Sequence, residues 1–173
     1  MFVKLLLLSS FLFTAQPLQI RRSPSMVPKT KSIQLDNATV KGPFTNDFSS
    51  WLKTNGYGVD DFDREDYGTQ ESFGGRQNPS DNITHYPVIF IHGNSDAALR
   101  TFEYSGWEFS IDYFLKNGYT TGELYATSWG NNDPLEANTR THNCKDVQRL
   151  RRFVEAVKNY TASRYVNIVS HSM

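Results

Sequence analysis

The chain has 173 residues, enough for one modest domain, and its 18 basic side chains are balanced by 18 acidic ones. Without a basic excess it cannot concentrate polyanions, so nucleic acid is not expected as a partner. An aromatic content of 14% and a mean hydropathy of -0.53 indicate a packed protein and exclude an integral membrane protein.

The N-terminus has the pattern of a secretory signal. The basic Lys4 precedes an apolar run over residues 5–13, which is too short to span a bilayer. This pattern favours export over a buried N-terminal helix. We expect a signal peptide over residues 1–15 and a flexible, proline-containing leader over residues 16–42, so that the protein is secreted.

Export affects the interpretation of several downstream residues. Asn37, Asn82 and Asn159 each begin an Asn-X-Thr tripeptide and become candidate glycosylation sites. Cys144 is the only cysteine, which leaves a free thiol, an intermolecular bridge or a partner absent from this chain. We favour a partner cysteine beyond residue 173. Without a second cysteine or a cluster of His, Asp and Glu, no metal site is expected.

Residues 43–86 are rich in Gly, Asp, Asn and aromatic residues. A short helix is predicted to end at Gly56. The rest of this segment, including Gly74-Gly75-Arg76, is predicted to be irregular structure that packs as an N-terminal segment on the fold formed by the residues that follow.

Strands and helices alternate from residue 87 onward. Apolar runs predict strands over 87–91, 124–127 and 165–169. Apolar residues at helical spacing predict one helix over 107–115, capped by Gly118, and a second over 147–157. Strands joined by helices predict an α/β fold with a doubly wound, mainly parallel sheet.

The second helix carries Arg149, Arg151 and Arg152, which are predicted to form its solvated face. The apolar faces of both helices are predicted to be core rather than cofactor sites. No phosphate-binding loop and no dinucleotide fingerprint is present, so no organic cofactor is expected.

Two predicted strand ends carry unusual residues. Parallel strands place their sites at their carboxyl ends, where His92-Gly93-Asn94 and Ser170-His171-Ser172-Met173 occur. The second segment fits a nucleophile elbow, in which a serine follows a strand at a tight turn flanked by small residues such as Ser170. Backbone amides of Met173 and Asn94 would then stabilise an oxyanion.

These segments together resemble the class 2 lipase family. The resemblance runs from about residue 43 to Met173 and implies the N-terminal part of an α/β-hydrolase domain that hydrolyses triacylglycerols or other fatty-acyl esters in lipid catabolism. It implies that Ser172 is the nucleophile of a Ser-Asp-His triad, with lipid at a lipid–water interface as substrate. The acid and histidine follow the serine in this fold. We therefore expect a chain truncated at the elbow and inactive by itself.

Other interpretations remain open. Ser172 alone would be an ordinary turn serine, and His92 and His171 are interpreted as structural. The main alternative function is an inactive secreted fragment or pseudoenzyme with a binding role. A lipid-binding module is a third class and would need an apolar cavity.

Overall fold

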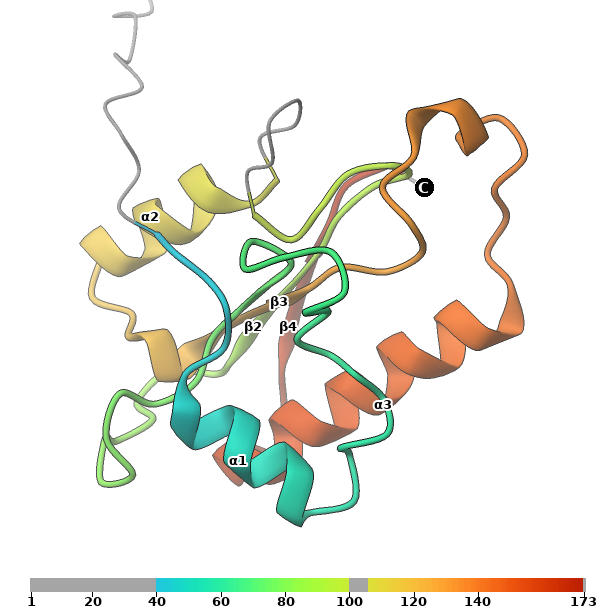
Figure 1. Ribbon diagram of the computed structural model, residues 1–173. Coiled ribbons are helices and arrows are strands. Elements are labelled where there is room, and N and C mark those ends of the chain that lie inside the picture. The colour runs from blue at the N-terminus through green and yellow to red at the C-terminus, as the bar shows by residue number, and fades with distance from the viewer. Residues whose placement is uncertain (1–39, 100–105, 173) are drawn as a thin grey trace, which may run out of the picture. The chain divides into compact units, whose positions relative to one another are not determined.

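The computed structural model describes residues 40–99 and 106–172. The predicted signal peptide, nearly all of the leader, Asn37 and Met173 lie outside these residues. In the described part of the chain, the elements alternate as an α/β fold requires (Figure 1).

The described residues form one mixed sheet of four strands in the order β1-β3-β2-β4. Its strands are β1 (Ser72–Phe73), β2 (Val88–Ile91), β3 (Leu124–Thr127) and β4 (Asn167–Ser170). Strand β2 lies between β3 and β4 and is parallel to both. The three strands predicted from apolar runs are therefore confirmed, although β4 begins two residues later than predicted.

Strand β1 was not predicted. It pairs antiparallel with β3, so the sheet is mixed rather than wholly parallel. Only two residues long and followed by Gly74, it has no alternation that sequence analysis could detect. Gly74 has a φ of 128°, and a Cβ atom there would lie 2.3 Å from the Leu124 carbonyl oxygen. A glycine is therefore required where the chain leaves β1 beside β3.

Helices cover both faces of this sheet (Figure 1). They are α1 (Asn46–Thr54), α2 (Glu108–Lys116) and α3 (Cys144–Thr161). Because strand side chains alternate between faces, neighbouring strand residues enter different cores. Ile89 and Tyr125 pack with α1 and α3, whereas Phe90 and Leu124 pack with α2.

Local side chains and glycines account for where the helices begin and end. The side chain of Thr45 caps α1, and that of Asn143 caps α3 through the Asp146 amide. Helix α1 ends at Thr54, followed by Gly56 at a φ of 83°, so the predicted helix end is confirmed within two residues.

The buried and exposed residues of α3 differ from those predicted. Val147, predicted to be buried, is 50% exposed, and the fully buried face starts only at Phe153. Arg149, predicted to be solvated, is half-buried and donates to the Asp61 carbonyl. The segment before residue 68 folds over this part of the helix, a long-range contact that helical periodicity does not encode.

A buried carboxylate fixes the approach to the sheet. Glu123, at the end of a short 3-10 turn before β3, is 0% exposed. It accepts hydrogen bonds from the amides of Thr84 (2.6 Å), His85 (2.8 Å) and Thr120 (2.9 Å). These bonds connect the segment before β2 to the start of β3, so Glu123 sets how the two strands enter the sheet.

The segments that follow β2 and β3 run to opposite faces of the sheet, towards α2 and α3 respectively (Figure 1). In α/β proteins, ligands bind beyond the carboxyl ends of the strands at the point where the following segments diverge in this way. No helix among residues 40–99 and 106–172 is long and apolar enough to cross a membrane.

Candidate active site

The two segments singled out in the sequence meet at one edge of the sheet. In the register of β2 and β4, Ile91 lies beside Ser170, so His92 and His171 follow at the same edge. The amide of His171 donates to the Ile91 carbonyl at 3.3 Å and extends the pairing beyond the strand. The structure thus brings the two strand ends together.

Ser172 has a backbone conformation that is uncommon for serine. Its φ of 57° lies in the left-handed region, where non-glycine residues are rare and cost about 1–3 kcal/mol unless the surroundings enforce them. The residue is exposed, and no hydrogen bond of its hydroxyl is present among the described residues. A left-handed serine directly after a strand, with its hydroxyl free of hydrogen bonds among the described residues, is compatible with a nucleophile elbow.

Gly93 forms the contact between the two segments. A Cβ atom on this glycine would lie 3.0 Å from both the Ser172 Cβ atom and the His171 carbonyl oxygen. The loop after β2 therefore packs against the turn at a distance that only a glycine permits without displacement.

Asn94 follows this glycine, and its amide N–H donates no hydrogen bond among the described residues. Its side chain is held by donation to the Ala137 carbonyl at 2.7 Å and accepts from Ser95 at 3.2 Å. The loop is thus anchored through side chains while its backbone amide stays available. Met173, the second predicted amide donor, lies outside the described residues.

His92 is buried and neutral. Its Nδ1 lies 2.7 Å from the Gly93 carbonyl, which only accepts, so Nδ1 carries the proton. Its Nε2 accepts from the Trp129 amide at 2.9 Å, and its own carbonyl accepts from the Trp129 indole at 2.7 Å. Burial lowers the pKa of His92 to about 4, against the raising effect of its bond to Gly93. The structural role predicted for His92 is confirmed.

The lowered pKa of His92 predicts that the contribution of this residue to protein stability depends on pH. Since only the neutral form fits, the contribution of His92 is complete above its ordinary pKa of 6.5 and declines as pH falls towards 4. Between pH 7 and pH 4, the native protein should lose about 3 kcal/mol of unfolding free energy relative to His92→Gln, which cannot take up that proton. Urea denaturation at both pH values measures the difference, and parallel losses in the two proteins would contradict it.

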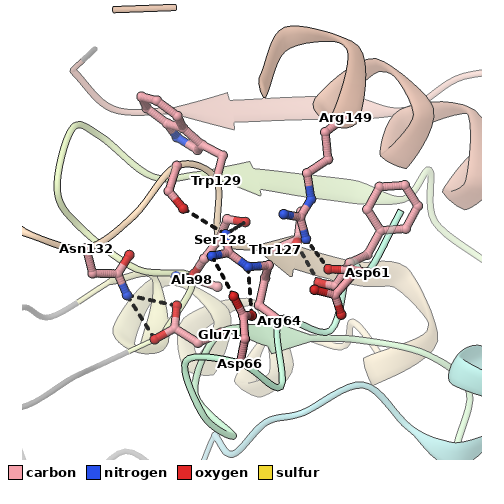
Figure 2. Close-up of polar contacts among 12 residues, drawn as sticks. Asp61, Arg64, Asp66, Glu71, Ala98, Thr127, Ser128, Trp129, Asn132 and Arg149 are labelled. Atoms are coloured by element: carbon pink, nitrogen blue, oxygen red, sulfur yellow. Dashed lines mark hydrogen bonds and ion pairs between the residues drawn. The ribbon is translucent and has the colours of Figure 1, made fainter. Parts of the chain in front are cut away.

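Sequence analysis missed the residues that hold the segment after β3, residues 128–132 (Figure 2). Arg64 is 5% exposed and donates to the carbonyl oxygens of Ser128 (3.4 Å) and Gly130 (2.8 Å). The buried Glu71 carboxylate accepts from the Asn132 amide group at 3.0 Å. All of these contacts join residues about sixty positions apart, and no local motif marks them.

Two clefts lie elsewhere on the described part of the chain. A cleft of about 830 Å³ lies beside the start of α3, and one of about 600 Å³ lies near the start of β4. Neither is lined by Ser172 or Asn94. The larger cleft is walled mostly by charged and polar side chains, so it is not the apolar cavity that a lipid-binding module needs. No cluster of three metal-ligating side chains occurs within the described ranges.

The remaining candidate residues are exposed on the surface. Asn82 is exposed in the loop before β2. Asn159 is exposed in the last turn of α3 and donates to the Tyr57 hydroxyl at 2.9 Å. Cys144 is the first residue of α3 and has an exposed thiol.

Comparison with known families agrees with this arrangement. The family model described as Lipase (class 2) matches residues 85–173, a segment that includes β2, β3, β4 and both intervening helices. No curated protein sequence matches the chain. Since the family match covers more than half of the residues, the chain belongs to the class 2 lipase family.

Proposed function

We propose that the protein hydrolyses fatty-acyl esters, triacylglycerols among them, with Ser172 as the nucleophile. Membership of a lipase family suggests ester hydrolysis. The observation that carries the assignment to Ser172 is its left-handed φ of 57° at the carboxyl end of β4. Such strain persists only where the surrounding structure enforces it, and it is typical of functional residues.

The proposed reaction begins with attack of the Ser172 oxygen on the ester carbonyl carbon. The carbonyl double bond opens, and its oxygen acquires negative charge. We propose that the amide N–H groups of Asn94 and Met173 donate to this oxygen. The Asn94 amide, which has no acceptor among residues 40–99 and 106–172, and the contact of its loop with Ser172 through Gly93 support this role. Loss of one such donor typically slows catalysis about a hundred- to a thousandfold.

The neutral state of His92 bears on its part in this reaction. Both of its ring nitrogens are occupied, one with the Gly93 carbonyl and one with the Trp129 amide. A histidine held in this way has no free nitrogen to accept the serine proton. His92 therefore supports the oxyanion loop, and the proton acceptor is a different residue.

Covalent labelling tests the nucleophile. An alkyl fluorophosphonate reacts when an activated serine oxygen attacks phosphorus and fluoride leaves, which gives a stable ester adduct. With the protein expressed from its complete gene, we expect mass spectrometry to find the adduct on Ser172. Ser170→Ala is the matched control and should be labelled normally, since alanine keeps the small residue that the turn needs. Labelling of a different serine, in a preparation that hydrolyses esters, would overturn the assignment.

A further inference from the structure

Arg64 is a buried arginine outside the proposed reaction, and its charge is already balanced. Its Nε and Nη2 donate to the two carboxylate oxygens of Asp66 at 3.0 and 3.2 Å. The guanidinium carbon lies 4.2 Å from the centre of the Tyr67 ring. Such a paired fork leaves Nη1 to bind elsewhere, and Figure 2 shows this group between Asp66 and Ser128.

The free end of Arg64 holds the segment that follows β3. Its Nη1 donates to the carbonyls of Ser128 and Gly130, the residues on either side of Trp129. Trp129 is 2% exposed, and its ring stacks on that of His92 with 5.5 Å between centroids. Two carbonyls held by one rigid guanidinium fix the backbone at Trp129 and so fix the direction of its amide N–H.

Trp129 transmits this fixed direction to the loop after β2. Its backbone and indole N–H groups both donate to His92, which donates to the Gly93 carbonyl. Gly93 contacts Ser172 and precedes Asn94. Hydrogen bonds joined by short stretches of backbone thus lead from Arg64 to the Gly93–Asn94 peptide, which carries the proposed oxyanion donor.

We propose that Arg64 is a positioning residue for catalysis, which holds the Asn94 amide in place through Trp129 and His92. The inference rests on the proposed ester hydrolysis. Loss of Arg64 would let the loop shift, and a displacement of about 1 Å at such a donor slows catalysis about a hundredfold. Substrate binding would change little, because Arg64 contacts the segment after β3 and is not part of the loop that carries Asn94.

The main test compares Arg64→Gln with Arg152→Gln. Arg152 is the matched control because it also holds a loop to the body of the protein, through Asp60 at 2.7 Å and the Gly56 carbonyl, whereas Arg64 holds the carbonyls of Ser128 and Gly130. We expect Arg64→Gln to lower kcat for a chromogenic ester about ten- to a hundredfold, with KM within about twofold. Arg152→Gln should keep the native kcat. Native kcat in a folded Arg64→Gln, or an equal loss in Arg152→Gln, would overturn the proposal.

A second variant tests the same role in case Arg64→Gln fails to fold. Arg64→Gly suits the backbone, since Arg64 has a φ of 53°, and Asp66 is 52% exposed and can be solvated without its partner. The glycine leaves a space of the shape of a guanidinium group. Added methylguanidinium should restore part of kcat in Arg64→Gly and have no effect on Arg152→Gln. Absence of rescue would count against positioning by the guanidinium.

One readout is independent of activity. The indole N–H signal of Trp129 in a proton–nitrogen correlation spectrum, assigned with Trp129→Phe, should shift in both Arg64 variants and stay in place in Arg152→Gln. An unchanged signal would overturn the proposed connection. If Ser172→Ala hydrolyses esters as fast as the native protein, the proposed function fails and so does the role in catalysis. The indole signal then still shows whether Arg64 positions the loop.

Discussion

Replacing Ser172 with alanine is expected to lower kcat for hydrolysis of a fatty-acyl ester by about a millionfold, the loss that serine hydrolases show when their nucleophile is removed. The free energy of unfolding should change by less than about 0.5 kcal/mol, since the side chain is exposed and its hydroxyl is unbonded within the described residues. Initial rates with a chromogenic ester and a urea denaturation curve measure the two quantities on one preparation.

Two further substitutions sharpen this result. Ser172→Gly should lose activity equally but gain up to about 1 kcal/mol in stability, because glycine tolerates the φ of 57° without strain. Ser170→Ala should remain active within a few fold. A Ser172→Ala variant as active as the native protein would overturn the proposed nucleophile. If the unmodified protein and all of its variants were inactive, a binding role on the same fold would be favoured.

Replacing Glu123 with glutamine should have the largest effect on stability, a loss of about 3 kcal/mol at pH 7. Glutamine keeps one acceptor oxygen but turns its amide group towards donors of Thr84, His85 and Thr120. Buried donors without acceptors are costly. Glu155→Gln is the matched control: Glu155 pairs with Arg151 on the exposed surface of α3, and its loss should cost less than about 0.5 kcal/mol.

The stability difference between the native protein and Glu123→Gln should depend on pH. Burial raises the pKa of Glu123, but the amides of His85, Thr120 and Thr84 outweigh this and lower it to about 2. The carboxylate therefore stabilises the fold fully above its ordinary pKa of 4.5, and this contribution is lost as pH falls towards 2. The difference between native protein and variant should disappear over that range. A difference that persists at pH 2 would show that charge is not its source.

The main strands could be predicted because their signal is local. Residues 87–91 are an uninterrupted apolar run, and residues 124–127 are apolar or aromatic up to Thr127; such runs indicate a strand covered on both faces. Strand β1 lacks such a signal, because it is a two-residue pairing that exists only beside β3. Arg149 was predicted wrongly because an earlier segment of the chain covers this part of α3. Val147 was predicted wrongly because the buried face of the helix starts only at Phe153, so the first turns lie outside the core.

The candidate site, like the fold, could be predicted from the sequence only in part. A serine after an apolar strand and a His-Gly pair after another are visible in the sequence, and so is their common edge once the strands are taken as parallel. The φ of Ser172 and the hydrogen bonds between Trp129 and His92 are not visible. They depend on which strands are neighbours, and no short motif around Arg64 or Trp129 encodes that choice.

The central position of β2 has a consequence for how the protein folds during synthesis. Both of its partner strands are made later by the ribosome, and β4 is made much later. Until then, Val88-Ile89-Phe90-Ile91 is an uncharged segment of high β propensity with two open edges. Pairing with β4 also closes the longer loop and is entropically the slower step. The nascent chain is thus most vulnerable to aggregation, and most dependent on chaperones, between synthesis of β2 and of β4.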